Sequence, residues 1–248
     1  DPDAIIRQVG QLPAAGDYVA LHFDGNASAA HFTRIKQGLR GDANVAFAPR
    51  RIKCGWGEWS LVEATLQTLR VAADQFADAT HFYMISGDCM PIKSSAFAHQ
   101  MLDGDDRDFI ESFDYFKSNW IKTGFREERL IYRHYFNERS QKRLKLVRKV
   151  PADIEMTIGS QWWCLRRNTV AAVLDFVAQR SDVVRFFKTT WIPDESFFQT
   201  LVRHVVPGRE IANKTLSFQM FSDYGMPVTF YNDHYDLLLG QGSLFARK

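Results

Sequence analysis

The stretch Ile192-Pro193-Asp194-Glu195-Ser196-Phe197-Phe198 places two carboxylates directly after a proline and directly before an apolar helical pattern. Proline favours extended backbone at the residue before it, so we expect a strand or loop that turns abruptly into a helix. Asp194 is a suitable N-cap, because its side chain can accept hydrogen bonds from free amides of the first turn. Glu195 would then lie at a helix start, a boundary where ligands often bind. The alternative is an ordinary cap whose acids complement the helix dipole.

The composition around this stretch is that of a globular domain. The chain has 248 residues, of which 46% are hydrophobic and 24% charged, enough for one large domain or two small ones with a substantial core. The net charge of +2 gives no support for a nucleic-acid partner. Cys54, Cys89 and Cys164 form no metal-binding spacing, and an odd cysteine count fits a reducing compartment.

The chain has no apolar run that could cross a bilayer and no run that resembles a signal peptide. We therefore expect no transmembrane segment. The sequence favours a cytoplasmic protein, with peripheral attachment at the inner membrane face as a further expectation.

Helical and extended patterns alternate along most of the chain. Helices are predicted over residues 2–12, 28–39, 57–76 and 168–179 and after Ser94 or Ser95, and strands over 18–23, 45–47, 81–85 and 159–165. Such alternation is typical of an α/β fold with a mostly parallel sheet and helices on both faces. Ligands of such sheets bind beyond the carboxyl ends of the strands. Asp24 and Asp88 each follow a predicted strand, so both are site candidates; alone, either could simply cap a turn.

The middle of the chain breaks this alternation. From Asp103 to Val150 it is highly charged, and Arg139–Lys149 holds six basic residues and no acid. A solvated loop or helix face is the simplest interpretation. The functional alternative is a mobile insertion that contacts an anionic or polar acceptor. We therefore predict a single domain over 1–248 with a charged, acceptor-side insertion at 103–156.

Several motifs, in the same order, resemble glycosyltransferase family 14, which holds the core-2 branching β-1,6-N-acetylglucosaminyltransferases and the peptide O-xylosyltransferases. The matching segments are Leu21–Asp24, Gly55–Gly57 with Ser60, Ile85–Lys93, Gly159–Trp163 followed by Pro193–Phe198, and Leu244–Lys248. The uninterrupted form, without a cysteine framework, looks like the bacterial branch. Family members open with a hydrophobic strand, whereas this sequence begins at the first helix, so we expect that strand to belong to the natural protein.

The resemblance implies a GT-A-like fold and transfer from a UDP-sugar with inversion at the anomeric carbon. The family's catalytic base corresponds to Glu195, which would take the proton of the acceptor hydroxyl. Family members hold the leaving diphosphate with basic residues in place of a DxD-bound metal, and Arg247 and Lys248 stand at those positions. We therefore expect no required metal and no cofactor besides the sugar donor.

Further roles follow from the same resemblance. It implies donor or nucleotide contacts for Asp24, Trp56 and Asp88, and acceptor contacts for Glu111, Trp162, Trp163 and Asp194. Core packing is the alternative for the two adjacent tryptophans. Loose counterparts of the family's cationic acceptor contacts are Lys117, Lys122 and Arg126.

Three functions stay open on the sequence. The leading prediction is transfer of N-acetylglucosamine in β-1,6 linkage to a surface or capsular glycan. The second is transfer of xylose from UDP-xylose. The third is a non-catalytic module that binds a glycan or a nucleotide.

Overall fold

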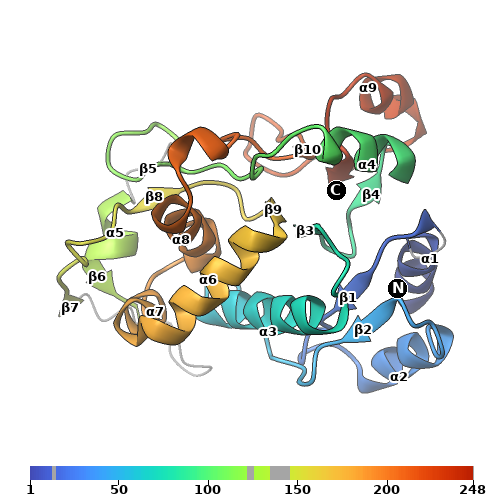
Figure 1. The fold of residues 1–248 in the computed structure, drawn as a ribbon, viewed down its shortest axis with the longest axis horizontal. Helices are drawn as coiled ribbons and strands as arrows, with labels where there is room; N and C mark the ends of the chain where they lie inside the picture. Colours follow the sequence, from blue (N-terminus) through green and yellow to red (C-terminus); the bar gives the residue numbers. More distant parts are fainter. Residues whose placement is uncertain (13–14, 122–125, 135–145, 248) are drawn as a thin grey trace.

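The helix α3 (Trp59–Gln75) crosses the middle of the molecule and organises its core (Figure 1). The computed structural model describes residues 1–12, 15–121, 126–134 and 146–247, with backbone only for residues 126 and 127. The buried side chains of α3 recur at helical spacing and comprise Val62, Ala64, Leu66, Gln67, Leu69 and Ala72. They pack with α6 (Arg167–Gln179) and α8 (Phe197–Val205) in the main hydrophobic cluster. The predicted helices at 57–76 and 168–179 are thereby confirmed.

The N-terminal elements form a smaller unit at one end of the molecule (Figure 1). The strands β1 (Val19–Leu21) and β2 (Val45–Phe47) pair in parallel, and α1 (Pro2–Gln11) packs on α2 (Ala29–Gly38). A second apolar cluster fills the space between them. Asp1 caps α1 by accepting from the amide of Asp3 at 3.0 Å. The helices predicted at 2–12 and 28–39 are confirmed within one or two residues at each end.

The sheet differs from the prediction. The strand β3 (His81–Tyr83) pairs antiparallel with β9 (Cys164–Arg166), and a β-bridge adds Phe109 to the other side of β9. The strand β11 (Phe245–Arg247) lies between β10 (Ser217–Gln219) and β4 (Met90–Pro91). Only the β1–β2 and β10–β11 pairings of the described strands are parallel, so the expectation of one mostly parallel sheet is wrong. The named strands are two or three residues long.

Helix α4 (Ser95–Asp103) begins where the sequence placed it. The Ser94 hydroxyl accepts from the amide of Phe97 at 3.2 Å and so caps the first turn. The remaining described elements are α7 (Ser181–Phe187), α9 (Tyr235–Leu239) and the 3-10 turns η2 (Pro193–Glu195), η3 (Gly208–Glu210) and η4 (Asn232–His234).

The charged segment 103–156 is not a solvated loop over its described part. It forms β5 (Phe113–Asp114), α5 (Arg126–Ile131), β6 (Tyr132–Arg133) and β7 (Leu146–Val147), and β5 pairs with β8 (Thr157–Ile158). The side chains of Ile110, Tyr115 and Leu130 are buried in the main cluster. Residues 135–145, which hold most of the predicted basic run, lie outside the described residues. The spacing of apolar residues in the sequence did not predict this contribution to the core, because these residues stand singly or in short groups among charged ones.

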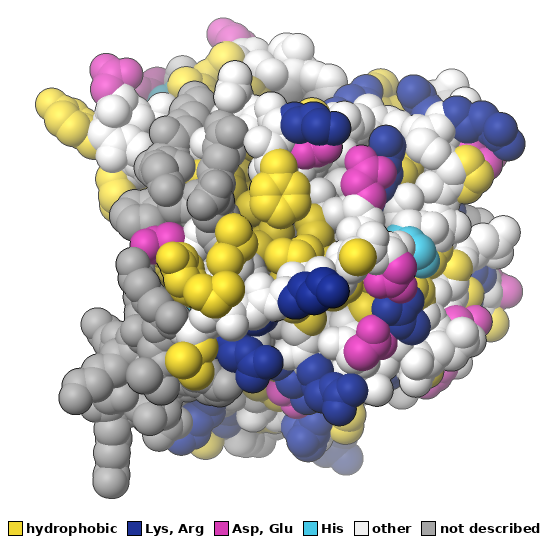
Figure 2. All heavy atoms as spheres, turned by 90° about the vertical axis from the view of Figure 1, so that its left-hand side faces the viewer, with side chains coloured by type: hydrophobic (Ala, Val, Ile, Leu, Met, Phe, Trp, Pro, Cys, Tyr) yellow, Lys and Arg dark blue, Asp and Glu magenta, His cyan; other side chains and the backbone are white. Residues whose placement is uncertain are grey.

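The end of the molecule that carries this segment has a distinct surface. Figure 2 shows hydrophobic side chains gathered there, with Lys and Arg side chains beside them. Among the segments at this end, Phe116, Leu146 and Val147 are exposed. In the described part of the chain no helix is long and apolar enough to span a membrane.

Candidate active site

A strained bend carries the two carboxylates of the opening motif. Ile192 adopts a left-handed conformation with φ 52° and ψ 58°, which costs a β-branched residue about 1–3 kcal/mol. Its amide donates to the carbonyl of Gly57 at 2.9 Å. Gly57 itself has φ +72°, and a Cβ there would lie 3.1 Å from the Trp191 indole nitrogen. The loop before α3 and the bend before Pro193 therefore fix each other, which sets the position of Glu195.

Asp194 is not the N-cap of α8, contrary to the prediction. The 3-10 turn η2 takes up residues 193–195, and Ser196 becomes the residue before the helix, without a side-chain cap. The Oδ1 atom of Asp194 is buried and has no partner among the described residues. Burial raises the pKa of Asp194 to about 7, and the neighbouring charge of Glu195 acts in the same direction. Asp194 is thus a carboxyl group that holds its proton far more strongly than an exposed one.

Glu195 forms an ion pair with a residue of the charged segment. Its Oε2 atom lies 2.7 Å from the guanidinium of Arg129 on α5. Burial raises the pKa of Glu195, while Arg129 opposes that effect and the charge of Glu111 adds to it. No hydrogen bond to the Oε1 atom is described within these ranges, and the Glu195 side chain is 28% exposed. The pair thus fixes one carboxylate oxygen of a side chain that stays partly exposed.

Glu111 lies beside this pair and is itself held in place. Its Oε2 atom accepts from the Trp120 indole and from the amide of Ser160, both at 2.9 Å. A Cβ at Gly159 would overlap the Glu111 backbone, so glycine is required at that position. The Gly159 amide donates to the carbonyl of Glu195 at 2.9 Å, which ties the two acidic segments together.

The buried Gln199 of α8 reinforces this arrangement. Its side-chain amide donates to the carbonyl of Ser160 at 2.8 Å and to that of Asp194 at 3.3 Å. The structure therefore brings together three predicted residues, namely Glu111, Asp194 and Glu195.

Arg247 and Asp88 form a second group at the β4–β11 pair. The guanidinium of Arg247 lies 4.6 Å from the centroid of the Trp162 ring. The pairing of Ala246 with Met90 brings Arg247 next to the turn that contains Asp88. Asp88 is exposed, and its backbone amide donates to the Ser86 hydroxyl at 3.3 Å. A cation and an exposed turn thus lie at the same place, which suits an anionic ligand.

The two adjacent tryptophans have different roles. Trp162 is buried against Arg247, and its amide donates to the Ser160 hydroxyl at 3.4 Å, so it connects this second group with the carboxylates. Trp163 packs on Phe198 in the hydrophobic core, with ring centroids 5.1 Å apart. Core packing, the alternative raised by the sequence, describes Trp163.

Asp24 and Trp56 lie at the start of α3. Asp24 accepts from the amides of Asn26 at 2.8 Å and Cys54 at 3.2 Å, so it stabilises the two loops that meet there. Trp56 is 76% exposed, and its ring lies edge-on to Trp191 at 6.2 Å. Trp56 therefore offers an open aromatic face, whereas Asp24 has the turn-capping role that was its simpler interpretation.

The remaining predicted residues contribute less. Lys248, Lys122 and the Arg126 side chain lie outside the described residues. Lys117 is 87% exposed and lies 3.5 Å from Asp114, away from any contact with Glu195 that the structure describes.

Sequence reasoning missed Arg129, Trp120, Trp191 and Gln199. Trp191 directly precedes the opening motif, so its position was a usable signal. Arg129 had none, because it is one of many cations in the charged segment.

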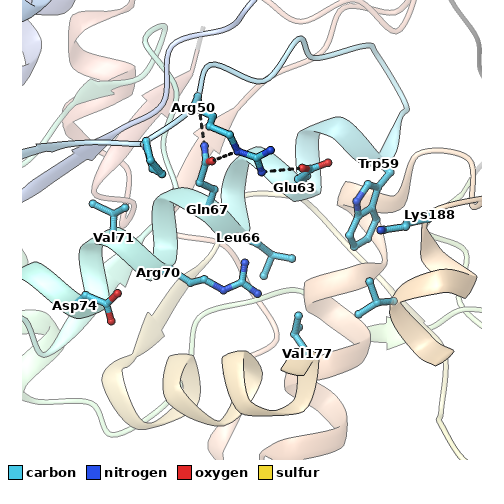
Figure 3. Close-up of a pocket in the computed structure, with 12 residues that line it drawn as sticks. Arg50, Trp59, Glu63, Leu66, Gln67, Arg70, Val71, Asp74, Val177 and Lys188 are labelled. Carbon is cyan, nitrogen blue, oxygen red and sulfur yellow. Dashed lines mark hydrogen bonds and ion pairs between the residues drawn. The ribbon is translucent and has the colours of Figure 1, made fainter. Parts of the chain in front are cut away.

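A separate cavity of about 520 Å³ lies between α3, α6 and α7 (Figure 3). Arg50, Trp59 and Lys188 are among its lining residues, and none of the predicted site residues lines it. The Arg50 side chain is already paired there with Glu63 and Gln67 at 3.4 and 3.3 Å. Over the described ranges, no three His, Cys, Asp or Glu side chains are grouped as they would be around a metal ion.

These features define a mixed α/β protein whose candidate site groups partly buried carboxylates with arginine and tryptophan side chains. The model of the Core-2/I-branching enzyme family matches residues 16–234. The chain therefore belongs to this family, a family of glycosyltransferases.

Two animal relatives are similar to the chain. It is 25% identical to human xylosyltransferase 2 over 222 residues, which is 85% of this chain and 24% of the relative. It is 27% identical to a xylosyltransferase of Ciona intestinalis over 172 residues, or 65% of this chain and 19% of the relative. The chain thus spans about a quarter of the length of these relatives or less. Because both are animal proteins, they do not test the bacterial branch, which stays a prediction.

Proposed function

We propose that the chain is the catalytic domain of an inverting glycosyltransferase that uses a UDP-sugar and a glycan acceptor, with Glu195 as the general base. The observation that carries this proposal is the geometry of Glu195: Arg129 holds Oε2 at 2.7 Å, while the side chain stays 28% exposed and no described residue binds Oε1. Membership of the Core-2/I-branching family supports it independently. On the same grounds we propose that the mixed α/β fold is a variant of the GT-A type.

In the proposed reaction, Oε1 of Glu195 takes the proton of the acceptor hydroxyl as that oxygen attacks the anomeric carbon. A bond forms between the acceptor oxygen and this carbon, and the bond from the carbon to the UDP oxygen breaks on the opposite face of the sugar. The UDP leaves with the bonding electrons, and its added negative charge faces Arg247. Lys248 would add a second cation. No step requires a metal ion, so metal independence is part of the proposal.

The other site residues divide between donor and acceptor in this proposal. Trp56 would cover the nucleotide with its exposed ring, next to the loops that Asp24 stabilises, and Asp88 would border the diphosphate. Glu111 and Asp194 would bind hydroxyl groups of the acceptor sugar. Trp162 would position Arg247 and would not itself stack on a sugar, because it is buried.

The leading donor is UDP-N-acetylglucosamine, used for a β-1,6 linkage. UDP-xylose is the second candidate, since the relatives are called xylosyltransferases. For the natural protein we propose the bacterial branch of the family, a cytoplasmic site of action, including the inner membrane face, and a surface polysaccharide as acceptor.

The test is release of UDP from each donor, with water or a panel of oligosaccharides as acceptor, in the presence and absence of EDTA. We expect turnover of one donor that EDTA leaves unchanged. Glu195→Gln should lower turnover about 100-fold or more while UDP binding persists. Glu63→Gln is the matched control, because Glu63 lines the separate cavity in Figure 3. UDP binding without turnover of either donor would favour a binding module, and strict Mn²⁺ dependence would refute the metal-free mechanism.

A further inference from the structure

Arg129 is the cation in contact with Glu195, and it is well shielded from water. The side chain of Arg129 is 12% exposed and that of Glu195 28%. An ion pair with so little solvent access is screened far less than a surface pair. The Arg129 guanidinium also lies 5.8 Å from the Trp191 ring, which limits where it can move. The contact is therefore a fixed part of the site.

The backbone of Arg129 is fixed by a second arginine. Arg148 is buried, and its guanidinium donates to the carbonyls of Leu130 at 2.6 Å and Arg129 at 3.3 Å. It also donates to the hydroxyl of Thr190 at 2.7 Å and stacks on Phe186 at 3.8 Å. Arg148 thereby joins the C-terminal end of α5 to the segment after α7.

Acidic groups surround the Glu195 carboxyl on the other sides. Burial raises the pKa of Glu195 most, and the charge of Glu111 raises it further. Asp194 precedes Glu195 on η2. Burial raises the pKa of the Tyr115 hydroxyl, the charge of Arg129 opposes that effect, and the charge of Glu195 adds to it. Arg129 is the cation that opposes these effects at Glu195. Without Arg129, the burial of Glu195 and the charge of Glu111 would raise its pKa unopposed, which makes the carboxylate harder to form.

We propose that Arg129 is a positioning residue for the base: its ion pair holds Oε2 of Glu195 and so directs the charged Oε1 towards the acceptor hydroxyl, and Arg148 holds Arg129 in place. The catalytic meaning of this contact rests on the proposed function. The contact itself can be tested without any turnover.

The first experiment measures the titration of Glu195 in the whole chain by ¹³C NMR of the side-chain carboxyls, with Glu195→Gln identifying the signal. Removal of the cation in Arg129→Met should raise the apparent pKa of Glu195 by about one or more. Arg129→Lys retains the charge and should shift the apparent pKa of Glu195 less. Arg50→Met is the matched control and should leave that pKa unchanged. An unaltered Glu195 titration in Arg129→Met would overturn the proposal.

The second experiment uses the donor that the wild type turns over. The acid limb of the kcat/KM profile should move to higher pH in Arg129→Met, with kcat lowered about tenfold or more and KM for the donor little changed. Arg129→Lys should keep the acid limb near its wild-type position and lower kcat, because a lysine cannot reproduce the guanidinium geometry. If Arg129→Met does not fold, the proposal is tested by the kcat and the acid limb of Arg129→Lys.

The two experiments separate the possible failures. A shifted titration without turnover of any donor would refute the proposed function and leave the ion-pair role intact. Normal turnover with an unshifted profile in a folded Arg129→Met would refute the role of Arg129 alone.

Discussion

Asp194 should make the protein less stable as the pH rises from 5 to 8, and Asp194→Asn should remove that dependence. The pKa of the Asp194 carboxyl is about 7 in the folded protein, whereas its ordinary pKa, which applies to the unfolded chain, is 3.8. Between these values the folded state holds a proton that the unfolded state has released, so stability falls with rising pH. The full effect is about 4 kcal/mol, since each pKa difference of one corresponds to about 1.4 kcal/mol. Roughly 2–3 kcal/mol of it falls between pH 5 and pH 8.

The assay is urea unfolding of wild type and Asp194→Asn at both pH values. The variant should gain roughly 2–3 kcal/mol over wild type on going from pH 5 to pH 8, because asparagine has no charge to bury. Asp223→Asn is the control: that side chain is exposed and makes no described ion pair, so the variant should follow the wild type at both pH values. An equal pH dependence in wild type and Asp194→Asn would refute the reasoning, because it would mean that the buried oxygen is satisfied in solution.

Four further substitutions test the packing around the site. Gly159→Ala should destabilise the protein by about 1–3 kcal/mol, because the new Cβ overlaps the Glu111 backbone. It should also change the near-UV circular dichroism, because the surroundings of the indole next to Glu111 change. Unchanged stability and an unchanged near-UV spectrum would contradict this. Arg148→Met should lower the unfolding free energy by about 3 kcal/mol or more, since it removes bonds to several buried carbonyls and hydroxyls; a thermal midpoint equal to that of wild type would be the contrary result. Trp163→Ala should lower the free energy of unfolding by about 3–5 kcal/mol, because Trp163 is buried. Trp56→Ala should leave the stability nearly unchanged and weaken UDP binding measured by calorimetry, because Trp56 is exposed. Similar losses of stability in both variants would refute the assignment of Trp163 to the core and Trp56 to the surface.

The sequence predicted the helices well because their signals are local. The repeated apolar spacing of α3 and the Ser94 cap of α4 depend on residues within one or two turns. Strand pairing was mispredicted because it is decided at long range. The partner of β3 is β9, more than 80 residues later, and nothing in residues 81–85 specifies its direction.

The same distinction holds at the site. Glu195 could be identified from its motif, because its neighbours in sequence are also its structural frame. Its ion-pair partner could not, since Arg129 lies 66 residues away among other cations. Asp194 was mispredicted as a cap because a single left-handed residue, Ile192, inserts a 3-10 turn before the helix. Local propensity does not predict this bend, because the hydrogen bond that fixes it comes from Gly57.

The turn that holds Asp88 depends on residues from opposite ends of the described chain. The Gln8 side chain donates to the carbonyls of Ser86 and Cys89, and β4 immediately after this turn pairs with β11. A ribosome must therefore have released residues 245–247 before this part of the site can close, and such distant contacts form slowly. The described contacts of the carboxylate cluster come from residues 111–199. Maturation of the protein should accordingly have two stages, in which a chain with its acids assembled still lacks Arg247, the cation that we propose faces the diphosphate.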